Sequence, residues 1–103
     1  MGLFNWFGSS GSNNESIKEY LQKDAVVVDV RTPMEFQEAN VQGSVNIPLH
    51  VLEARFHEIK EMNKPIVAVC RSGARSGNAT IFLKRQGIDV INGGPWQNVA
   101  SEI

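Results

Sequence analysis

Two apolar runs, at residues 25–30 and 66–69, constrain the fold more than any other feature of this sequence. Both are rich in β-branched residues, and neither alternates between apolar and polar side chains. Such strands are typical of a parallel sheet covered on both faces, because a sheet with one wet face would show alternation. Apolar residues recur at helical spacing over residues 50–62 and 76–86. Strands that alternate with helices predict an α/β fold with a mainly parallel sheet.

Shorter elements complete the predicted order. They are a helix capped by Asn13 or Asn14, a helix that starts at Thr32 and Pro33, a strand at 43–48, a strand at 90–91, a turn at 92–95 and a helix around Trp96. Ligands of such sheets bind beyond the carboxyl ends of the strands. Asp29 and Cys70 stand at the ends of two predicted strands, so we expect the functional site there.

The length and charge of the chain limit the classes of partner. A length of 103 residues fits one domain, predicted at residues 13–103 after a flexible segment at 1–12. The formal net charge of −1 provides no overall basic field, so neither nucleic acid nor a membrane surface is an expected partner. Attraction for an anion would have to come from a local cluster.

The single cysteine, Cys70, excludes an intramolecular disulfide and a cysteine-rich zinc site. The two histidines, His50 and His57, have no cysteine nearby, so we expect no metal and no cofactor. A lone thiol suits a reducing compartment. The apolar start at residues 1–7 lacks the basic and long apolar regions of a signal peptide, which favours a cytoplasmic location.

The most informative segment is residues 70–77, CRSGARSG. A cysteine leaves a buried strand, a loop with glycine and two arginines follows, and a helix then begins. This arrangement would aim backbone N–H groups and a helix N-terminus at the thiol. Together with Arg71 and Arg75, they should lower the pKa of Cys70 from ~8.5 into the ~3.5–7.5 range of reactive cysteines. We therefore predict an accessible, largely ionised nucleophile rather than an inert core residue.

The same loop would cradle an anion, because arginine presents a planar fork of donors that matches oxyanions. The expected substrate is a small anion with an electrophilic atom. A sulfane sulfur, a phosphate ester and an arsenate all meet this description, so the loop alone leaves the chemistry open.

Four stretches of the chain, in order, resemble the rhodanese family. They are DVRTPMEF at 29–36, GSVNIP at 43–48, CRSGARS at 70–76 and GGPW at 93–96. The resemblance implies a three-layer fold with a central, mainly parallel sheet of five or possibly four strands flanked by helices. It also implies that Cys70 carries a persulfide, with the transferred sulfur surrounded by Arg71, Ser72, Gly73, Ala74 and Arg75.

The resemblance implies transfer of a sulfane sulfur from thiosulfate or a persulfide donor to cyanide or a thiol. A thioredoxin-type protein is among the candidate acceptors. Arg71 and Arg75 would bind the donor's oxygens, and Arg75 could also fix the loop. Asp29, Arg31 and Ser76 are expected to support the loop rather than touch the substrate, with Arg31 paired to a nearby acid such as Glu35.

Two other functions remain as alternatives. Cysteine-dependent phosphatases and arsenate reductases of related fold place five residues between cysteine and arginine. Here four residues separate Cys70 from Arg75, which makes a smaller cradle that suits one sulfur better. The other alternative is a non-enzymatic or slow sulfur carrier that acts mainly by docking to a protein partner.

Overall fold

The computed structural model describes the backbone of residues 9–103 and the side chains of residues 15–103. The elements, in chain order, are α2 (Ser9–Gln22), β1 (Val26–Asp29), α3 (Pro33–Glu38), β2 (Val45–Asn46), α4 (Leu49–Met62), β3 (Ile66–Cys70), α5 (Ala74–Arg85), β4 (Val90–Pro95) and α6 (Trp96–Ala100). Strands and helices alternate along the chain, as the sequence predicts.

The first helix begins at Ser9, before the predicted caps at Asn13 and Asn14. Serine and asparagine are both favoured at helix starts, so this stretch offers several starting points. Residues 1–8 of the predicted N-terminal segment lie outside the described residues. The division of the chain at residue 12 stays a prediction.

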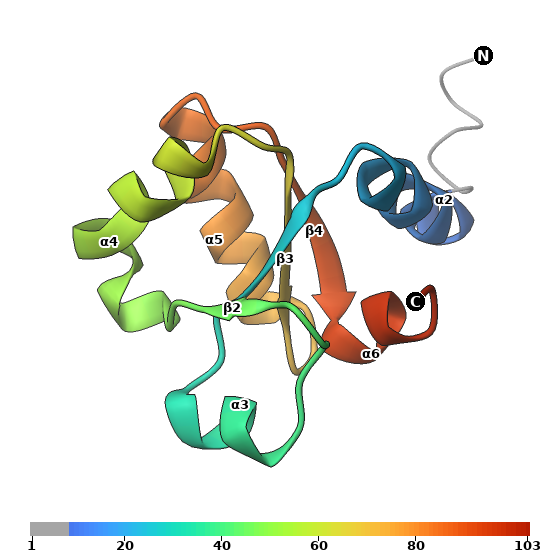
Figure 1. The fold of residues 1–103 in the computed structure, drawn as a ribbon, viewed down its shortest axis with the longest axis horizontal. Coiled ribbons are helices and arrows are strands. Elements are labelled where there is room, and N and C mark those ends of the chain that lie inside the picture. The colour runs from blue at the N-terminus through green and yellow to red at the C-terminus, as the bar shows by residue number, and fades with distance from the viewer. Residues whose placement is uncertain (1–8) are drawn as a thin grey trace.

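Within the described residues the strands form one parallel sheet of four, in the order β2-β1-β3-β4. Four is the smaller of the two predicted counts. Because every strand runs the same way, their carboxyl ends meet at one edge, and α3 lies beyond that edge (Figure 1). In register, Asp29 of β1 pairs with Val69 of β3, and Cys70 pairs with Pro95 of β4. The two polar strand ends therefore lie side by side, as expected.

Helices cover both faces of the sheet (Figure 1). One buried cluster joins β1 and β3 to α4 and α5 through Leu52, Ile59 and Leu83, and Phe56 meets Phe82 edge to face between the two helices. The other cluster joins the opposite face to α2 and α6 through Ile17 and Val99. Burial on both faces explains why β3 shows no polar alternation.

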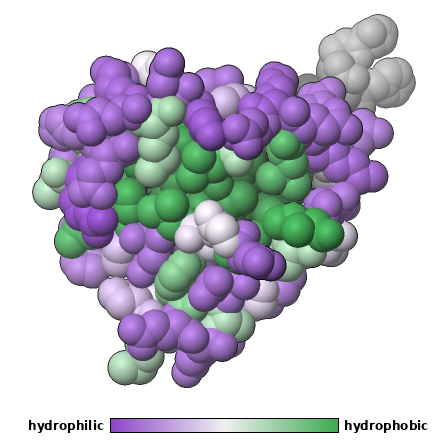
Figure 2. Space-filling model, viewed as in Figure 1, coloured by the Kyte–Doolittle hydropathy of each residue, from purple (hydrophilic) through white to green (hydrophobic). Residues whose placement is uncertain are grey.

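The outer edge of β1 is only partly covered. Strand β2 is two residues long and pairs with Val28 and Asp29, so Val26 has no strand neighbour on that side. Figure 2 shows hydrophobic residues gathered in the middle of the view, with hydrophilic residues around them. Val26 and Val45 are accordingly half-buried, whereas Val28 is fully buried.

Candidate active site

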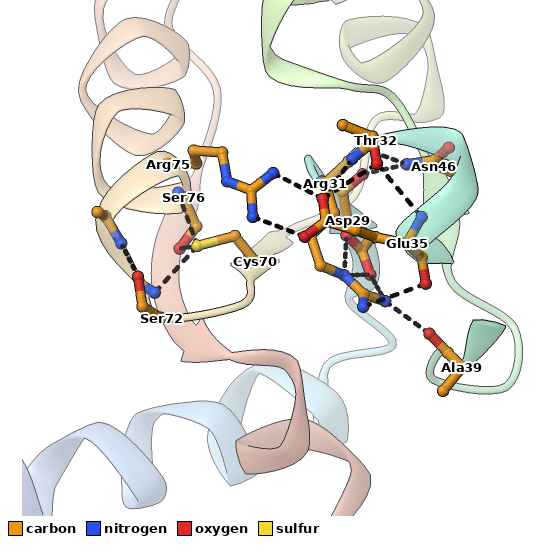
Figure 3. A network of polar contacts seen from close by, with 12 residues as sticks. Asp29, Arg31, Thr32, Glu35, Ala39, Asn46, Cys70, Ser72, Arg75 and Ser76 are labelled. Atoms are coloured by element: carbon orange, nitrogen blue, oxygen red, sulfur yellow. Dashed lines mark hydrogen bonds and ion pairs between the residues drawn. The ribbon is translucent and has the colours of Figure 1, made fainter. Parts of the chain in front are cut away.

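The sulfur of Cys70 lies in a ring of hydrogen-bond donors at the end of β3 (Figure 3). The backbone N–H of Gly73 donates to Sγ at 2.9 Å, and the backbone N–H of Ser76 at 3.3 Å. The Ser76 Oγ also lies 3.3 Å from Sγ. Backbone N–H groups cannot accept a hydrogen bond, so the ring is built to hold a negatively charged sulfur.

This ring changes the thiol's acidity. Burial raises the pKa of Cys70, but hydrogen bonds from the Ser76 hydroxyl and from the amides of Ser76, Gly73 and Ser72 outweigh it, so the pKa is lowered from 9.0. The predicted direction agrees with the structure. The cause differs in part, because hydrogen bonds rather than the loop arginines dominate the shift.

Cys70 is less accessible than the sequence analysis expects. The residue is fully buried, while Arg71, Ser72 and Ala74 of the same loop are exposed. The reason is that the side chain lies beneath its own loop, where the inward-facing amides reach the sulfur. The cysteine therefore occupies the base of a loop whose outer side faces solvent.

Glycine at position 73 makes the loop possible. Gly73 has φ of +101°, in the left-handed region, and it precedes the first residue of α5. A Cβ there would also stand 3.3 Å from the Cα of Gly94. The helix begins at Ala74, not at Ser76 as expected, so Ala74 and Arg75 are helical. The positive end of the helix dipole consequently lies next to the sulfur.

Arg75 is held by an acid from another element. Its Nη1 and Nη2 atoms donate to Oε1 and Oε2 of Glu35 in α3, at 2.8 and 3.1 Å. The Arg75 guanidinium, together with the Thr32 backbone N–H, lowers the pKa of Glu35 to about 2. The fork predicted to bind the donor's oxygens is thus occupied by a carboxylate in this structure. Arg71, by contrast, is exposed and forms no ion pair within residues 15–103.

Asp29 and Arg31 form a buried pair at the end of β1. The Asp29 Oδ2 accepts from Arg31 Nη2 at 2.7 Å, and Oδ1 accepts from the Arg31 backbone N–H at 2.9 Å. Arg31 pairs with a nearby acid as expected, but that acid is Asp29 and not Glu35, of which Arg31 reaches only the backbone carbonyl, at 3.4 Å. Arg31 also donates to the Ala39 carbonyl and lies over the Trp96 ring. The Arg31 side chain therefore connects the end of β1 to the C-terminal part of α3.

The sequence analysis missed the contribution of Asn92 and anticipated that of Glu35 only in part. Glu35 was named as a candidate partner of Arg31, and it is the N3 residue of a capping box with Thr32 as N-cap, but its pairing with Arg75 had no sequence signal. Asn92 was assigned to a turn, whereas β4 continues to Pro95 and the Asn92 side chain reaches the loop. Its Oδ1 accepts from Ser76 Oγ at 2.6 Å, and its Nδ2 donates to the Gly73 carbonyl at 3.2 Å.

Among the described residues, no group of three or more His, Cys, Asp or Glu side chains could hold a metal ion. In the same part of the chain, every helix is too short or too polar to cross a membrane. The site has one sulfur whose hydrogen-bond donors are arranged for an anion.

Comparison with known proteins identifies the family. The family model described as "Rhodanese-like domain" matches residues 13–97. The chain belongs to the rhodanese-like family. The resemblance drawn from the four sequence stretches is thereby confirmed, and the parallel sheet flanked by helices is the fold that rhodanese-like structures share.

Several rhodanese-like relatives are sulfurtransferases by name. A sulfurtransferase of Allochromatium vinosum is 35% identical over 77 residues, which cover 73% of this chain and 71% of the relative. Thiosulfate sulfurtransferase PspE of Escherichia coli is 33% identical over 75 residues, covering 71% and 72%. The crystal structure of a rhodanese-related protein of Thermoplasma volcanium superposes with a TM-score of 0.72 at 29% identity, covering 86% of this chain and 88% of that one. These similarities support sulfurtransferase chemistry at the level of the family.

Proposed function

We propose that this protein is a sulfurtransferase that carries a sulfane sulfur as a persulfide on Cys70. Thiosulfate or a persulfide is the donor, and cyanide or a thiol is the acceptor. The observation that carries this proposal is the ring of donors on Sγ from Gly73 and Ser76. Such a ring stabilises a thiolate before the reaction and the anion of a persulfide after it.

In the first half of the cycle, the Cys70 thiolate attacks the outer sulfur of thiosulfate. A new S–S bond forms to Cys70, the S–S bond of thiosulfate breaks, and its electron pair leaves with sulfite. The product is a persulfide anion on Cys70. No proton is needed in this step because the nucleophile is already ionised.

In the second half, an acceptor nucleophile attacks the outer sulfur of the persulfide. The S–S bond to Cys70 breaks, and its electron pair returns the thiolate to the protein. Cyanide yields thiocyanate, and a thiolate yields a new persulfide. Because the described chain has a single cysteine, the acceptor thiol must come from outside, with a thioredoxin-type protein as one candidate.

The two arginines have different roles in this proposal. Arg71 is exposed and unpaired within residues 15–103, so it is the cation that meets the donor's oxygens. Arg75 is a positioning residue, since its pair with Glu35 fixes the first turn of α5 and with it the Ser76 amide. Asp29 and Arg31 support the same region through α3.

The phosphatase alternative is weaker because the residues between Cys70 and Arg75 number one fewer than in those enzymes, and Arg75 is occupied by Glu35. The carrier alternative differs from the enzyme in the rate of turnover rather than in the chemistry of the sulfur transfer.

A cytoplasmic location is also part of the proposal, and the single free cysteine supports it.

The test is an assay of thiocyanate formed from thiosulfate and cyanide, with an aryl phosphate assayed in parallel. Parallel lines in double-reciprocal plots, the signature of a two-step covalent mechanism, are expected, with no phosphate release. Hydrolysis of the aryl phosphate without thiocyanate formation would overturn the proposal. Single-turnover transfer followed by very slow cycling would favour a carrier.

A further inference from the structure

The Ser76 hydroxyl has one proton but two acceptors within reach. Its Oγ lies 2.6 Å from Oδ1 of Asn92 and 3.3 Å from Sγ of Cys70. Because an amide oxygen is a stronger acceptor than the sulfur of a neutral thiol, the proton points towards Asn92 when Cys70 is protonated. In that state the Cys70 S–H can donate to Ser76 Oγ, which completes a chain of hydrogen bonds from Cys70 to Asn92.

The orientation of the Asn92 side-chain amide is fixed by two backbone groups, one that can only donate a hydrogen bond and one that can only accept. The Gly94 N–H can only donate, and it lies 2.9 Å from Oδ1. The Gly73 carbonyl can only accept, and it lies 3.2 Å from Nδ2. Oδ1 is consequently the atom that faces Ser76, and Asn92 cannot rotate its amide to become a donor there without losing both contacts.

Strand β4 has a bulge immediately after Asn92. Ala68 pairs with Asn92, but the next residue, Val69, pairs with Gly94, so Gly93 is the extra residue. A Cβ on Gly93 would stand 2.7 Å from Cγ1 of Val67, so a side chain cannot be accommodated without a shift. The bulge sets Gly94 opposite Val69 and Pro95 opposite Cys70, and the Gly94 N–H lies 2.9 Å from Oδ1 of Asn92.

We propose that Asn92 is a positioning residue that competes with the Cys70 sulfur for the Ser76 hydroxyl proton and so sets how readily Cys70 ionises. When Cys70 loses its proton to solvent, the Ser76 hydroxyl hydrogen turns from Oδ1 to Sγ. No heavy atom has to move. Asn92 Oδ1 keeps the Gly94 N–H as its donor, so no buried acceptor is left without a partner.

The other donors on the sulfur cannot be redirected, since they are backbone amides. The charged groups that surround the site come from the β1 end, from α3 and from the loop and first turn of α5. They are Asp29, Arg31, Glu35, Arg71 and Arg75. A neutral substitution at Asn92 alters none of these charges. Any change in the pKa of the Cys70 thiol would therefore come from the hydrogen bonds.

The test measures the pKa of Cys70 from the ultraviolet absorbance of the thiolate in the reduced, full-length protein. Wild type, Asn92→Ala, Ser76→Ala and the double variant form a cycle. Asn92→Ala should lower the pKa by about half to one unit, because the hydroxyl is then free for the sulfur. In the Ser76→Ala background the same substitution should have no effect. An equal shift in both backgrounds, or no shift in either, would overturn the proposal.

Asn98→Ala is the matched control. Asn98 donates from Nδ2 to the Gly93 carbonyl at 3.0 Å, so this variant also loses an anchor of the β4 segment but leaves Ser76 untouched. Its Cys70 pKa should stay at the wild-type value. If it shifts as far as Asn92→Ala, the effect is loosening of the loop and the proposal is wrong.

A second variant keeps the question answerable if Asn92→Ala does not fold. Asn92→Asp presents a stronger acceptor to Ser76 and adds a negative charge, so it should raise the Cys70 pKa by a unit or more, on the order of one charge-assisted hydrogen bond. An unchanged or lower pKa in this variant would contradict competition for the proton. The inference rests on the proposed function only in taking Cys70 as the nucleophile. The titration needs no sulfur donor, so absence of turnover and absence of the shift are separate results.

Discussion

At the scale of single residues, Cys70 combines full burial with a lowered thiol pKa. Burial by itself would raise the pKa, because it disfavours the charged form. The pKa of Cys70 is lowered instead, because the amides of Gly73 and Ser76 and the Ser76 hydroxyl are already oriented towards the sulfur. The lowered pKa of the Cys70 thiol therefore depends on hydrogen bonds set by the loop's shape more than on the loop's charge.

The pH dependence of sulfur loading follows from this arrangement. The rate of persulfide formation should rise with pH as the thiol ionises and should level off with a midpoint below 9.0. Ser76→Ala removes one donor from the anion and should move that midpoint upwards by about half to one unit. Stopped-flow loading with thiosulfate across a pH series measures both midpoints. A midpoint unchanged by Ser76→Ala would show that the hydroxyl plays no part.

Arg71 should govern the affinity for the donor. Arg71→Ala removes an exposed cation that is unpaired in the described part of the chain, so KM for thiosulfate should rise roughly three- to tenfold, with a smaller change in kcat. Steady-state kinetics at low ionic strength provide the measurement. The matched control is Arg85→Ala, an exposed cation at the other end of α5, which should leave KM as it is. Equal effects of the two substitutions would mean that Arg71 contributes only general charge.

At the scale of elements, α3 connects the end of β1 to the start of α5 at the carboxyl edge of the sheet. Arg31 donates to the carbonyls of Glu35 and Ala39, and the Glu35 carboxylate accepts from Arg75 in the first turn of α5. The Glu35–Arg75 pair thus connects α3 to α5 through two residues that lie 40 apart in the sequence. The active-site loop is held from the α3 side by this pair and from the β4 side by Asn92.

Glu35→Gln tests whether the Glu35–Arg75 pair stabilises the fold, through the pH dependence of the free energy of unfolding. The folded pKa of Glu35, about 2, lies below its ordinary value of 4.5, so the pair stabilises the fold above pH 4.5 and this contribution is lost as the pH falls towards 2. The variant keeps the capping box but loses the charge. Its deficit in the free energy of unfolding should be about 1 kcal/mol at neutral pH.

Urea unfolding of wild type and Glu35→Gln at several pH values measures this deficit, which should shrink as the solution is acidified. Glu58→Gln is the control, since Glu58 pairs with Arg55 within a single exposed helical stretch. A deficit that stays constant down to the lowest pH would show that the charge of Glu35 is not what stabilises α3 against α5.

The elements also show where sequence reasoning reaches its limit. Valine and isoleucine runs placed β1 and β3, because burial on both faces removes polar alternation. The glycines at 93 and 94 predicted a turn, yet they lie in a strand, where Gly93 permits close approach to Val67. Glycine marks both turns and close packing, and only the neighbouring strand decides between them. The contribution of Asn92 was hidden for this reason.

At the scale of the whole molecule, the sheet separates two apolar clusters, and the reactive sulfur belongs to the cluster on the α4 and α5 side. The family and the fold were predictable, since both follow from local motifs and from the apolar patterning of the strands. The assignment of Cys70 as the nucleophile stays a prediction. The partners of Arg75 and Ser76 were not predictable, because Glu35 and Asn92 lie 40 and 16 residues away along the chain and only the tertiary structure brings them close. The choice between the two predicted strand counts also required the structure, which has four strands within residues 9–103.

This separation predicts that stability and reactivity can be changed independently. Ile17 is fully buried on the α2 side, so Ile17→Ala should cost about 2–5 kcal/mol of unfolding free energy. The pKa of Cys70 should not change, because the hydrogen bonds to its sulfur come from the loop and from α5. Urea unfolding and thiolate titration of the same sample provide both values. A thiol pKa that rises along with the loss of stability would contradict this independence.

The most direct measurement is the intact mass of the reduced protein after incubation with thiosulfate. The account predicts the addition of one sulfur atom, located on Cys70 by peptide analysis, removed by cyanide and absent in Cys70→Ser. An unchanged mass under conditions where the thiol is ionised, or the same added mass on Cys70→Ser, would contradict it.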